Sequence, residues 1–580
     1  MAETIISPGV FQRENDISFI APAPVEAGAA ILGPTVKGPV EVPTIVTSYN
    51  EFHRTFGVTF ESGSNSHEFL TSLAVKSYFD QGGNTCLVTR VVSGSFSAAS
   101  STDISTDTGS ISNPFSIETL GKGVIYNNST GADDPGAENS DNSLISGSDC
   151  NVRWEIANVD SSKGTFTLVV RRGDDNHKNK IVLESFNNLS LDPNADNYIE
   201  KVVGNQSISK LTDSDGVVYI GTSGEFVNKS RYIRISNVSK ATLNYLGTDG
   251  VTILSGSDGI SYTHYLPAAQ SGSFYDAVGS VKPGANLFSN ITTQTQGLVA
   301  ANYADAITIL GNSDEYLFNV ISAPGLTYDK HSSVLDTVIS LAETRGDCIA
   351  VVDLYSYGAT VSNVTGKAAL LNSSYAAAYW PWLQTASANG KNVWVPASTV
   401  IPGVFAFTDG AAAPWFAPAG LVRGGIPGVI QAERKLTRND RDALYNGKVN
   451  PIATFPGTGI AVFGQKTLQT KASALDRVNV RRLLIELKKF IGDQAKNLVF
   501  EQNTIATRNK FLATVNPYLD SVVQRQGLYA YRVVMDDTNN AADVVDRNQL
   551  VGQIFIQPAK TAEFIVLDFV VEPTGATFAV

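Results

Sequence analysis

Strand-like and helix-like patterns alternate in residues 28–92. The segments GAAILG, VPTIVTS and TCLVTRVV are short, apolar and rich in β-branched residues, which is typical of strands, and the third follows a Gln-Gly-Gly turn. Between the second and third segments, apolar residues recur at helical spacing over residues 69–79. The pattern predicts an α/β unit near the start of the chain.

The pattern changes to strict alternation after residue 150. Val152, Trp154 and Ile156 alternate with polar neighbours such as Arg153, and residues 165–171 repeat the same period of two. Such alternation is typical of a hairpin in a sheet that has one face on the core and one face in water. We therefore expect an antiparallel hairpin with a wet outer face here.

A change in composition marks an inserted unit. Residues 93–150 are crowded with Ser, Asp, Asn and Gly, and short strand patterns separated by turn signals continue to about residue 285. The preceding α/β pattern resumes only after this stretch. We interpret residues 95–285 as a β-rich domain inserted into the α/β domain.

The α/β rhythm returns with the segments YLFNVISAP, VLDTVISLAE and CIAVVDLY. Residues 349–354 are almost entirely apolar, as expected for a parallel strand that is buried on both faces. Residues 375–425 are rich in Trp, Pro and Gly, so we expect them to be irregular but heavily packed.

The C-terminal part combines two helices with three strands. Apolar residues at helical spacing predict helices over residues 473–501 and 504–525. The segments LYAYRVVM, VGQIFIQP and AEFIVLDFVVEP follow as strands. Residues 564–571 are apolar at nearly every position except Asp568, so both faces of that strand should be covered.

Bulk composition narrows the class of protein. With 580 residues, of which 43% are hydrophobic and 17% charged, the chain should fold into about three or four domains. A net charge of -12 disfavours direct binding of nucleic acid. No apolar run is long enough to span a membrane and no secretion signal precedes the first strand, which predicts a soluble protein without stable membrane insertion. Three widely spaced cysteines, Cys86, Cys150 and Cys348, indicate reduced thiols.

The pattern of polar residues favours neither an active site nor a metal or cofactor site. The histidines stand singly, and Pro39 occupies the lysine position of a phosphate-loop-like glycine spacing. Asp353, at the end of a parallel-type strand, is the best catalytic candidate by position, but the sequence offers it no partner. Asp536, Asp537, Asn539 and Asn540 lack the glycine and glutamate of a calcium loop and indicate a polar turn. We expect no enzyme, and no catalytic, metal or cofactor-binding residues.

Several long segments resemble one known family. NPIATFPGTGIAVFGQKTL, RNKFLATVNPYLDSVVQRQGLYAYRVVMDDTNN and QIFIQPAKTAEFIVLDF are strongly similar to the tail sheath proteins of contractile-tailed bacteriophages. The segments SPGVF, GPTVKGPVEVPTIVTSYNEFHRTFG, YFDQGGNTCLVTRV, SSYAAAYWPWLQ and FNNLSLDPNADNYIEKVVG match the same family in the same order. The matches run from residue 7 to about residue 570.

The resemblance implies a multidomain α+β and α/β fold with a conserved inner domain built from both chain ends. The implied function is that of a structural subunit that polymerises as stacked hexameric rings around the tail tube and contracts to drive the tube through the host envelope for genome delivery. The implied partners are further copies of the chain, the tail tube protein, and baseplate and tail terminator proteins, in a virion assembled in the host cytoplasm. The expected domains are a linking arm, an α/β core, a β-rich outer insertion and a tube-proximal C-terminal domain: residues 1–20, 21–94 with 286–440, 95–285 and 441–580.

Both chain ends are candidates for contacts between subunits. ISPGVFQREN is apolar and carries a turn signal, and a terminal segment stays ordered only when something holds it. Terminal strands can satisfy their backbone groups by joining the sheet of a neighbour, as the family's arms do. The resemblance assigns Val10 and Phe11 to an N-terminal arm, and Phe564, Val566 and Phe569 to a C-terminal linking strand. The alternative is that these ends pack within their own subunit.

The long C-terminal helix carries a basic stripe. Arg477, Arg481 and Lys488 share one side of it, and residues 471–496 hold seven basic and three acidic side chains in a chain of net negative charge. In the family an inner-domain helix faces the tube, so the resemblance implies that this stripe contacts acidic groups of the tube protein. A solvated helix face is the alternative.

Other functions remain as alternatives. The sheath of a genome-free contractile injection particle, such as a tailocin-type device, would have the same sequence features. An extracellular β-rich adhesin fits the insertion but requires a secretion signal, and an α/β hydrolase-like enzyme fits residues 349–354 but requires a nucleophile and a base.

Overall fold

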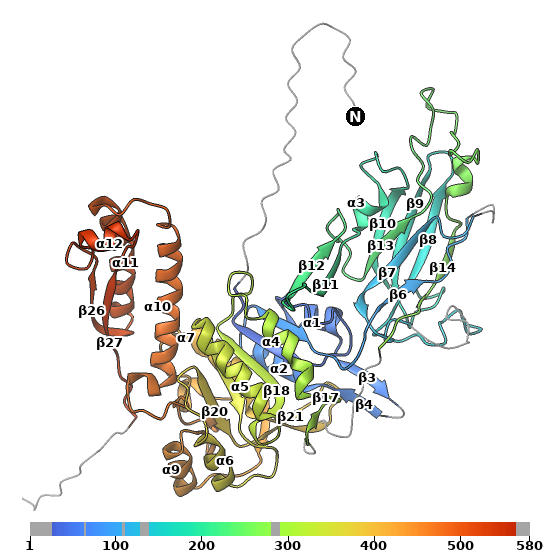
Figure 1. The fold of residues 1–580 in the computed structure, drawn as a ribbon. Helices are drawn as coiled ribbons and strands as arrows, with labels where there is room; N and C mark the ends of the chain where they lie inside the picture. Colours follow the sequence, from blue (N-terminus) through green and yellow to red (C-terminus); the bar gives the residue numbers. More distant parts are fainter. Residues whose placement is uncertain (1–25, 63–64, 107–110, 128–137, 280–290, 564–580) are drawn as a thin grey trace, which may run out of the picture.

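The computed structural model describes residues 26–62, 65–106, 111–127, 138–279 and 291–563. Figure 1 shows three lobes: a central α/β domain, a β-rich lobe formed by the insertion, and a lobe of two long helices and a hairpin formed by the C-terminal part. The mixed multidomain fold expected from the sequence is confirmed.

The central domain is built on one eight-stranded sheet. Its strand order is β2-β5-β1-β18-β19-β20-β24-β25, and the inner six strands are parallel with an antiparallel strand at each edge. The strands are β1 (Ala29–Gly33), β2 (Thr44–Val46), β5 (Cys86–Arg90), β18 (Val320–Thr327), β19 (Ile349–Asp353), β20 (Ala376–Trp380), β24 (Asn450–Phe455) and β25 (Gly459–Val462).

Helices cover both faces of this sheet, which explains why β1, β5, β18, β19 and β20 are buried at every position. Alternate side chains of each strand enter two separate cores: Ala350 packs on one face and Val351 on the other. One core is covered by α4 (Ala304–Ile309), α5 (Tyr328–Arg345), α6 (Val361–Ala368) and α9 (Arg438–Asn446). The other is covered by α1 (Tyr49–Phe56), α2 (Leu70–Asp80) and α7 (Ile401–Ala411).

Residues 375–425 are more regular than the sequence indicated. They contain β20 and α7, and also β21 (Leu383–Ala386) and β22 (Asn392–Val395), which lie in one sheet with β23 (Val429–Ala432). The apolar runs are short and interrupted by proline, so their periodicity is weak, although tertiary packing still makes them strands.

The predicted boundary at residue 440 falls before β24 and β25, which belong to the central sheet. β24 adds to β20 in parallel and then turns back into β25. The central sheet therefore extends to Val462, and the C-terminal lobe begins after it.

The insertion forms two antiparallel four-stranded sheets around one core. Phe115 stacks on Phe166 across the two sheets, with 5.4 Å between ring centroids. One sheet contains β10 (Val182–Ser190), β9 (Thr165–Arg172), β8 (Val152–Asp160) and β14 (Gln270–Gly272); the other contains β13 (Ile233–Val238), β7 (Phe115–Lys122), β6 (Ala98–Ser101) and β15 (Phe274–Tyr275). Smaller elements are α3 (Ile199–Val203), the hairpin β11 (Ser207–Thr212) and β12 (Val218–Ser223), and the 3₁₀ turn η1 (Tyr262–Tyr265).

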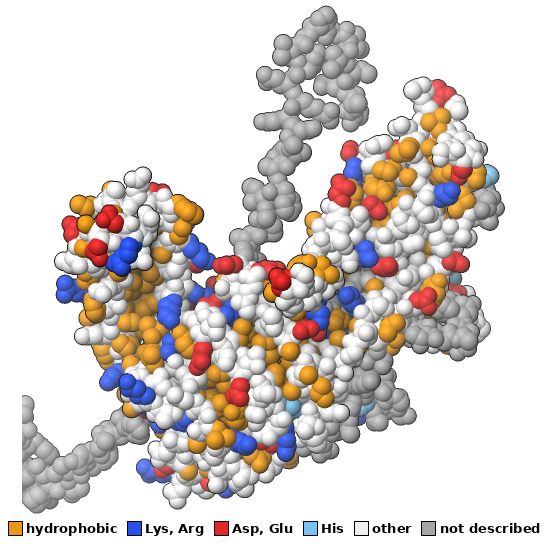
Figure 2. Space-filling view, viewed as in Figure 1, with side chains coloured by type: hydrophobic (Ala, Val, Ile, Leu, Met, Phe, Trp, Pro, Cys, Tyr) orange, Lys and Arg blue, Asp and Glu red, His pale blue; other side chains and the backbone are white. Residues whose placement is uncertain are grey.

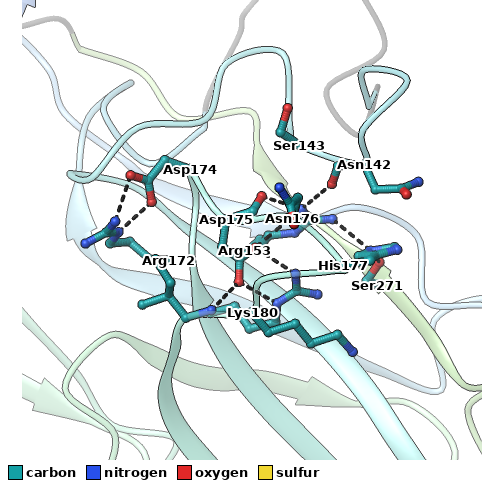
Figure 3. Close-up of polar contacts among 12 residues, drawn as sticks. Asn142, Ser143, Arg153, Arg172, Asp174, Asp175, Asn176, His177, Lys180 and Ser271 are labelled. Atoms are coloured by element: carbon teal, nitrogen blue, oxygen red, sulfur yellow. Dashed lines mark hydrogen bonds and ion pairs between the residues drawn. The ribbon is translucent and has the colours of Figure 1, made fainter.

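The expected wet face on the β8–β9 hairpin is wrong at its centre. β8 and β9 pair as predicted, but the outward-pointing Arg153 and Arg171 are fully buried. The loop after β9 folds back and places Asp175 against them. Arg171 Nε and Nη2 donate to the two carboxylate oxygens of Asp175 at 2.8 and 2.7 Å. Arg153 Nη1 donates to the Asp175 backbone carbonyl (Figure 3). Alternation indicated which side chains leave the core but not that a loop covers them.

The C-terminal lobe has its own core. It consists of the 3₁₀ turn η4 (Ala474–Asp476), α10 (Val478–Lys496), α11 (Ile505–Gln524), β26 (Leu528–Val534), α12 (Ala542–Asp546) and β27 (Gln553–Pro558). α10 joins this lobe to the central domain, because Val478 and Ile485 lie in the central core whereas Leu483 and Leu487 lie in the C-terminal core. One helix therefore fixes the position of the C-terminal lobe on the central sheet.

The remaining described elements are short. They are the hairpins β3 (Thr59–Ser62) with β4 (Asn65–Glu68) and β16 (Gln294–Thr295) with β17 (Leu298–Val299), the helix α8 (Gly420–Arg423), and the 3₁₀ turns η2 (Ala300–Tyr303) and η3 (Ala397–Thr399).

Candidate assembly surface

The hairpin β26–β27 is a two-stranded sheet at the far end of the chain. Its two strands are antiparallel, and their register places Tyr531 opposite Ile556 and Val533 opposite Ile554. These four side chains pack toward α11 and the C-terminal core. Within the described ranges no third strand pairs with either β26 or β27. Unpaired strand edges of this kind can accept an added strand.

The opposite face of the hairpin is exposed and of mixed polarity, because Phe555 lies opposite Arg532 and between Gln553 and Gln557 along β27. Tyr529 is 66% exposed and Phe555 is 56% exposed. The space-filling view shows hydrophobic side chains over the C-terminal lobe and along its junction with the central domain (Figure 2). An open strand edge next to exposed aromatic rings is the usual acceptor for an added strand, because backbone bonds supply affinity and the rings supply burial.

Hydrogen bonds hold the connection between β26 and β27. The Asn540 side-chain amide donates to the carbonyl of Val551 at 2.8 Å, and its oxygen accepts the Val551 N–H at 2.8 Å. Asp537 forms an ion pair with Arg508 of α11. This is the polar turn that the sequence indicated for residues 536–540.

The residues predicted for the two arms lie outside the described residues. Val10 and Phe11 precede Glu26, and Phe564, Val566 and Phe569 follow Glu563. Their assignment to contacts between subunits remains a prediction.

The basic stripe on α10 lies against the central domain along much of its length. The Arg481 guanidinium is buried and stacks on the Tyr375 ring at 4.0 Å from the centroid. Lys488 is exposed, and its ammonium donates to the Tyr375 hydroxyl at 3.0 Å. Arg477, just before the first turn, forms an ion pair with Glu563 at 2.7 Å. Of the three predicted stripe residues, only Lys488 is exposed.

Two further cations of α10 complete this contact. Arg482 pairs with Asp409 of α7 and lies over the Phe405 ring, while Lys489 pairs with Glu26 at 2.7 Å. The sequence showed the cations but not these partners, because Asp409 and Glu26 are far from α10 along the chain. Only the chain's path in three dimensions brings them together.

Asp353 has a partner in the structure. It lies buried at the carboxyl end of β19, where it accepts hydrogen bonds from the Ser398 N–H at 3.0 Å and from the Ser398 hydroxyl. The Ser398 carbonyl in turn accepts from the Ser322 hydroxyl at 2.9 Å. Ser398 contacts Asp353 directly, without an intervening imidazole, so this is not the arrangement of a Ser-His-Asp nucleophile. The carboxyl instead ties the η3 turn to the central sheet.

Burial raises the pKa of Asp353 to about 7, although both Ser398 hydrogen bonds act in the opposite direction. Between about pH 4 and pH 7 the Asp353 carboxyl is therefore protonated in the folded chain but ionised in the unfolded chain. Stability contributed by the protonated carboxyl should be present below pH 4 and lost as the pH rises through 7. The loss amounts to roughly 1.4 kcal/mol for each pH unit that separates the folded and unfolded pKa values.

Asp353→Asn is expected to remove this pH dependence. The amide stays neutral and can still accept the Ser398 N–H bond, so the difference in urea midpoint between the variant and the parent chain should grow in the variant's favour from pH 5 to pH 8. A constant difference across this range would contradict the assignment. Other buried carboxyls with a raised pKa, such as Glu68 and Glu433, are common to both chains and cancel in the comparison.

The described residues contain neither a cluster of metal ligands nor a disulfide. No group of three or more His, Cys, Asp or Glu side chains there could hold a metal ion. The three cysteines are free and buried. Among the described helices, none is both long and apolar enough to cross a membrane.

Two family profiles match this chain. The central domain of phage tail sheath proteins matches residues 296–468, and the C-terminal domain of phage tail sheaths matches residues 470–572. Residues 296–572 are therefore similar to two consecutive domains of phage tail sheath proteins. The boundary between the two sheath domains falls after β25, where the central sheet ends.

Relatives among phages agree with these two matches. The tail sheath protein of Vibrio phage KVP40 is 42% identical over 217 residues, which are 37% of this chain and 31% of that protein. The tail sheath protein of Enterobacteria phage T4 is 35% identical over 283 residues, which are 46% of this chain and 43% of that protein. The matches therefore span less than half the length of these two relatives.

A solved sheath structure shares the fold of almost the whole chain. The sheath tail protein of Listeria innocua superposes with a TM-score of 0.50 at 11% identity, over 92% of this chain and 96% of that one. At this identity the likeness concerns the fold alone. It includes most of the chain outside the two matched sheath domains.

Proposed function

We propose that this chain is the structural subunit of a contractile tail sheath. It polymerises as stacked hexameric rings around a tail tube and contracts to drive the tube through the host envelope for genome delivery. The observation that carries this proposal is the pair of adjoining sheath domains over residues 296–468 and 470–572. The work is done by a change of packing summed over many subunits, which needs no catalytic site.

Contacts between copies are the first requirement of such a polymer. The open edges of β26–β27 and the exposed Tyr529 and Phe555 support strand addition at this hairpin. The arms that would supply the strands are residues 1–20, with Val10 and Phe11, and the C-terminal segment with Phe564, Val566 and Phe569. Each copy then gives two strands and receives two, which makes the contact heterologous and allows a helical array.

The second requirement is a face toward the tube. The predicted tube-proximal domain contains α10, and Lys488 is the stripe residue whose charge is exposed. Arg477 and Arg481 would support this face through the contacts that orient α10. Further partners are the baseplate and tail terminator proteins at the two ends of the sheath. The particle is a virion assembled in the host cytoplasm, and the β-rich domain of residues 95–285 points outward from it.

Electron microscopy of the purified protein tests the proposal. Negatively stained samples at increasing concentration, with and without tubes of the tail tube protein, should contain striated cylinders. A chain that stays strictly monomeric at high concentration, with tubes present, would overturn it.

Lys488→Glu is expected to weaken assembly on tubes. Reversal of the exposed charge turns attraction to acidic tube groups into repulsion, so about tenfold more protein should be needed to decorate tubes, an effect that falls as salt is added. Quantitative co-sedimentation with tubes measures it.

Lys510→Glu on α11 is the matched control, because that lysine is also exposed but lies outside the stripe. It should decorate tubes like the parent chain. Equal behaviour of both variants would argue against a tube-facing stripe. Arg481→Glu is unsuitable for this test, because it would leave a buried carboxylate over the Tyr375 ring.

A further inference from the structure

The chain leaves the hairpin in an unexpected direction after β27. Only residues 559–563 separate Pro558 from the apolar segment of residues 564–571. A connection of this length commonly joins two antiparallel strands. The sequence alone would therefore place the apolar segment beside β27, on the free edge of its own hairpin.

The described chain instead descends from the lower end of β27 to the junction of α10 with the central domain (Figure 1). The Ala559 N–H donates to the Gly527 carbonyl at 3.1 Å, and the Thr561 hydroxyl lies 2.5 Å from the Gln465 side-chain amide. The last described residue, Glu563, is 86 residues from its main partner, Arg477. The Ala559 bond extends the hairpin by one residue, and residues 560–563 then leave it toward the central domain.

Four hydrogen bonds hold the Glu563 carboxylate. Arg477 donates from Nε and Nη2 to the two oxygens at 2.7 and 3.0 Å. The Tyr445 hydroxyl donates to Oε2 at 2.6 Å, and the Gln465 amide donates to Oε1 at 3.0 Å. A fork-like arginine contact with two further donors fixes both the position and the orientation of the carboxylate.

The donors come from three separate elements. Tyr445 lies on α9, Gln465 is buried in the connection after β25, and Arg477 directly precedes α10. Partial burial would raise the pKa of Glu563, but the bonds from Arg477, Tyr445 and Gln465 lower it, so the carboxylate stays charged at neutral pH. The holders belong to the central domain and the base of α10, not to the hairpin.

We propose that Glu563 anchors the start of the C-terminal arm to the central domain and so keeps the arm off its own β26–β27 hairpin, leaving it for another copy of the chain. A released arm would sit within reach of its own open edge at an effective concentration near the millimolar range, well above the concentration of other copies in solution. Closure on itself would then cap both the donor and the acceptor of the polymer contact. This inference rests on the proposed function, because it assumes that the arms link copies.

Glu563→Ala is expected to give a folded monomer that polymerises poorly. Hydrogen exchange of the β27 amides in the monomer should slow by about tenfold or more, since the released arm covers the edge. The concentration needed for cylinders in electron micrographs should rise by about tenfold. Tyr445→Phe with Gln465→Ala removes the other two holders and should show the same two changes to a smaller degree.

Three comparisons make the test decisive. Asp543→Ala removes an exposed ion pair with Arg547 on α12 and should behave like the parent chain. Glu563→Ala in a chain ending at residue 563 should lose the slowed exchange, which shows that the arm itself covers the edge. Exchange and polymerisation of Glu563→Ala equal to those of the parent chain would overturn the anchor.

Results that contradict the proposed function differ from results that contradict the Glu563 anchor. If the parent chain truncated at residue 563 still forms normal cylinders, the C-terminal arm does not link copies. If the parent chain forms no cylinders under any condition, the sheath assignment itself fails. The exchange measurement on monomers reports on the anchor in both cases.

Discussion

Removal of residues 1–15 is expected to leave a folded chain that no longer forms cylinders. The start of β1 is held without these residues, because the Ala27 N–H donates to Leu317 and the Gly28 N–H donates to Thr85. The thermal midpoint should therefore shift by less than about 2 °C. Polymerisation should be lost, because each copy would still have an acceptor hairpin but no N-terminal strand to add to the hairpin of its neighbour. Calorimetry and negative-stain microscopy measure the two effects.

A point variant refines this deletion. Val10→Asp with Phe11→Asp keeps the length of the arm but removes its apolar side chains, and it should reproduce the loss of cylinders. A marked drop in the thermal midpoint of the deletion would contradict the linking role and favour an arm that packs within its own subunit.

Asp175→Ala is expected to unfold the outer part of the insertion. Its carboxylate is the buried counter-ion of Arg171, and Arg153 lies 3.6 Å from it. Without it the buried Arg171 loses its bidentate partner and keeps one ion pair, with Glu155 at 2.8 Å, so we expect a cost of about 3 kcal/mol. Hydrogen exchange resolved along the chain should show faster exchange over β8, β9 and β10, while the central sheet keeps its protection.

The neighbouring residue supplies a matched control. Asp174 pairs with Arg172, and both side chains are about one-third exposed. Asp174→Ala should change stability by at most about 1 kcal/mol, because exposed ion pairs contribute little. Equal effects of the two variants would show that burial of the network does not stabilise the insertion. Because the insertion and the central sheet have separate cores, unfolding should not be treated as a single two-state transition.

α10 shows what helical periodicity predicts and what it does not. Helical spacing predicted its existence and its apolar face, and the helix is present as Val478–Lys496. The same spacing placed Arg477, Arg481 and Lys488 on one side but could not show that Arg481 would be covered by Tyr375. A cation at a helical position is compatible with solvent, a partner protein or an aromatic ring of the same chain, and periodicity does not distinguish these environments.

Asp353 illustrates the same limit for a single residue. Its place after an apolar run correctly put it at the carboxyl end of a parallel strand. Its partner Ser398 is 45 residues away, in a stretch that the sequence indicated to be irregular. Asp353, the best catalytic candidate by position, therefore accepts hydrogen bonds that hold the fold together.

By itself, the sequence determined the element order, the inserted β-rich unit, the apolar strands of the central sheet and the resemblance to tail sheaths. These features depend on local periodicity and on contiguous motifs, which a chain carries in any conformation. Only the tertiary structure decided which polar groups are buried, that α10 is docked through Tyr375, Asp409 and Glu26, and that Glu563 is held at the central domain. These outcomes depend on contacts between residues distant in sequence, whose energies arise only when folding removes both partners from water.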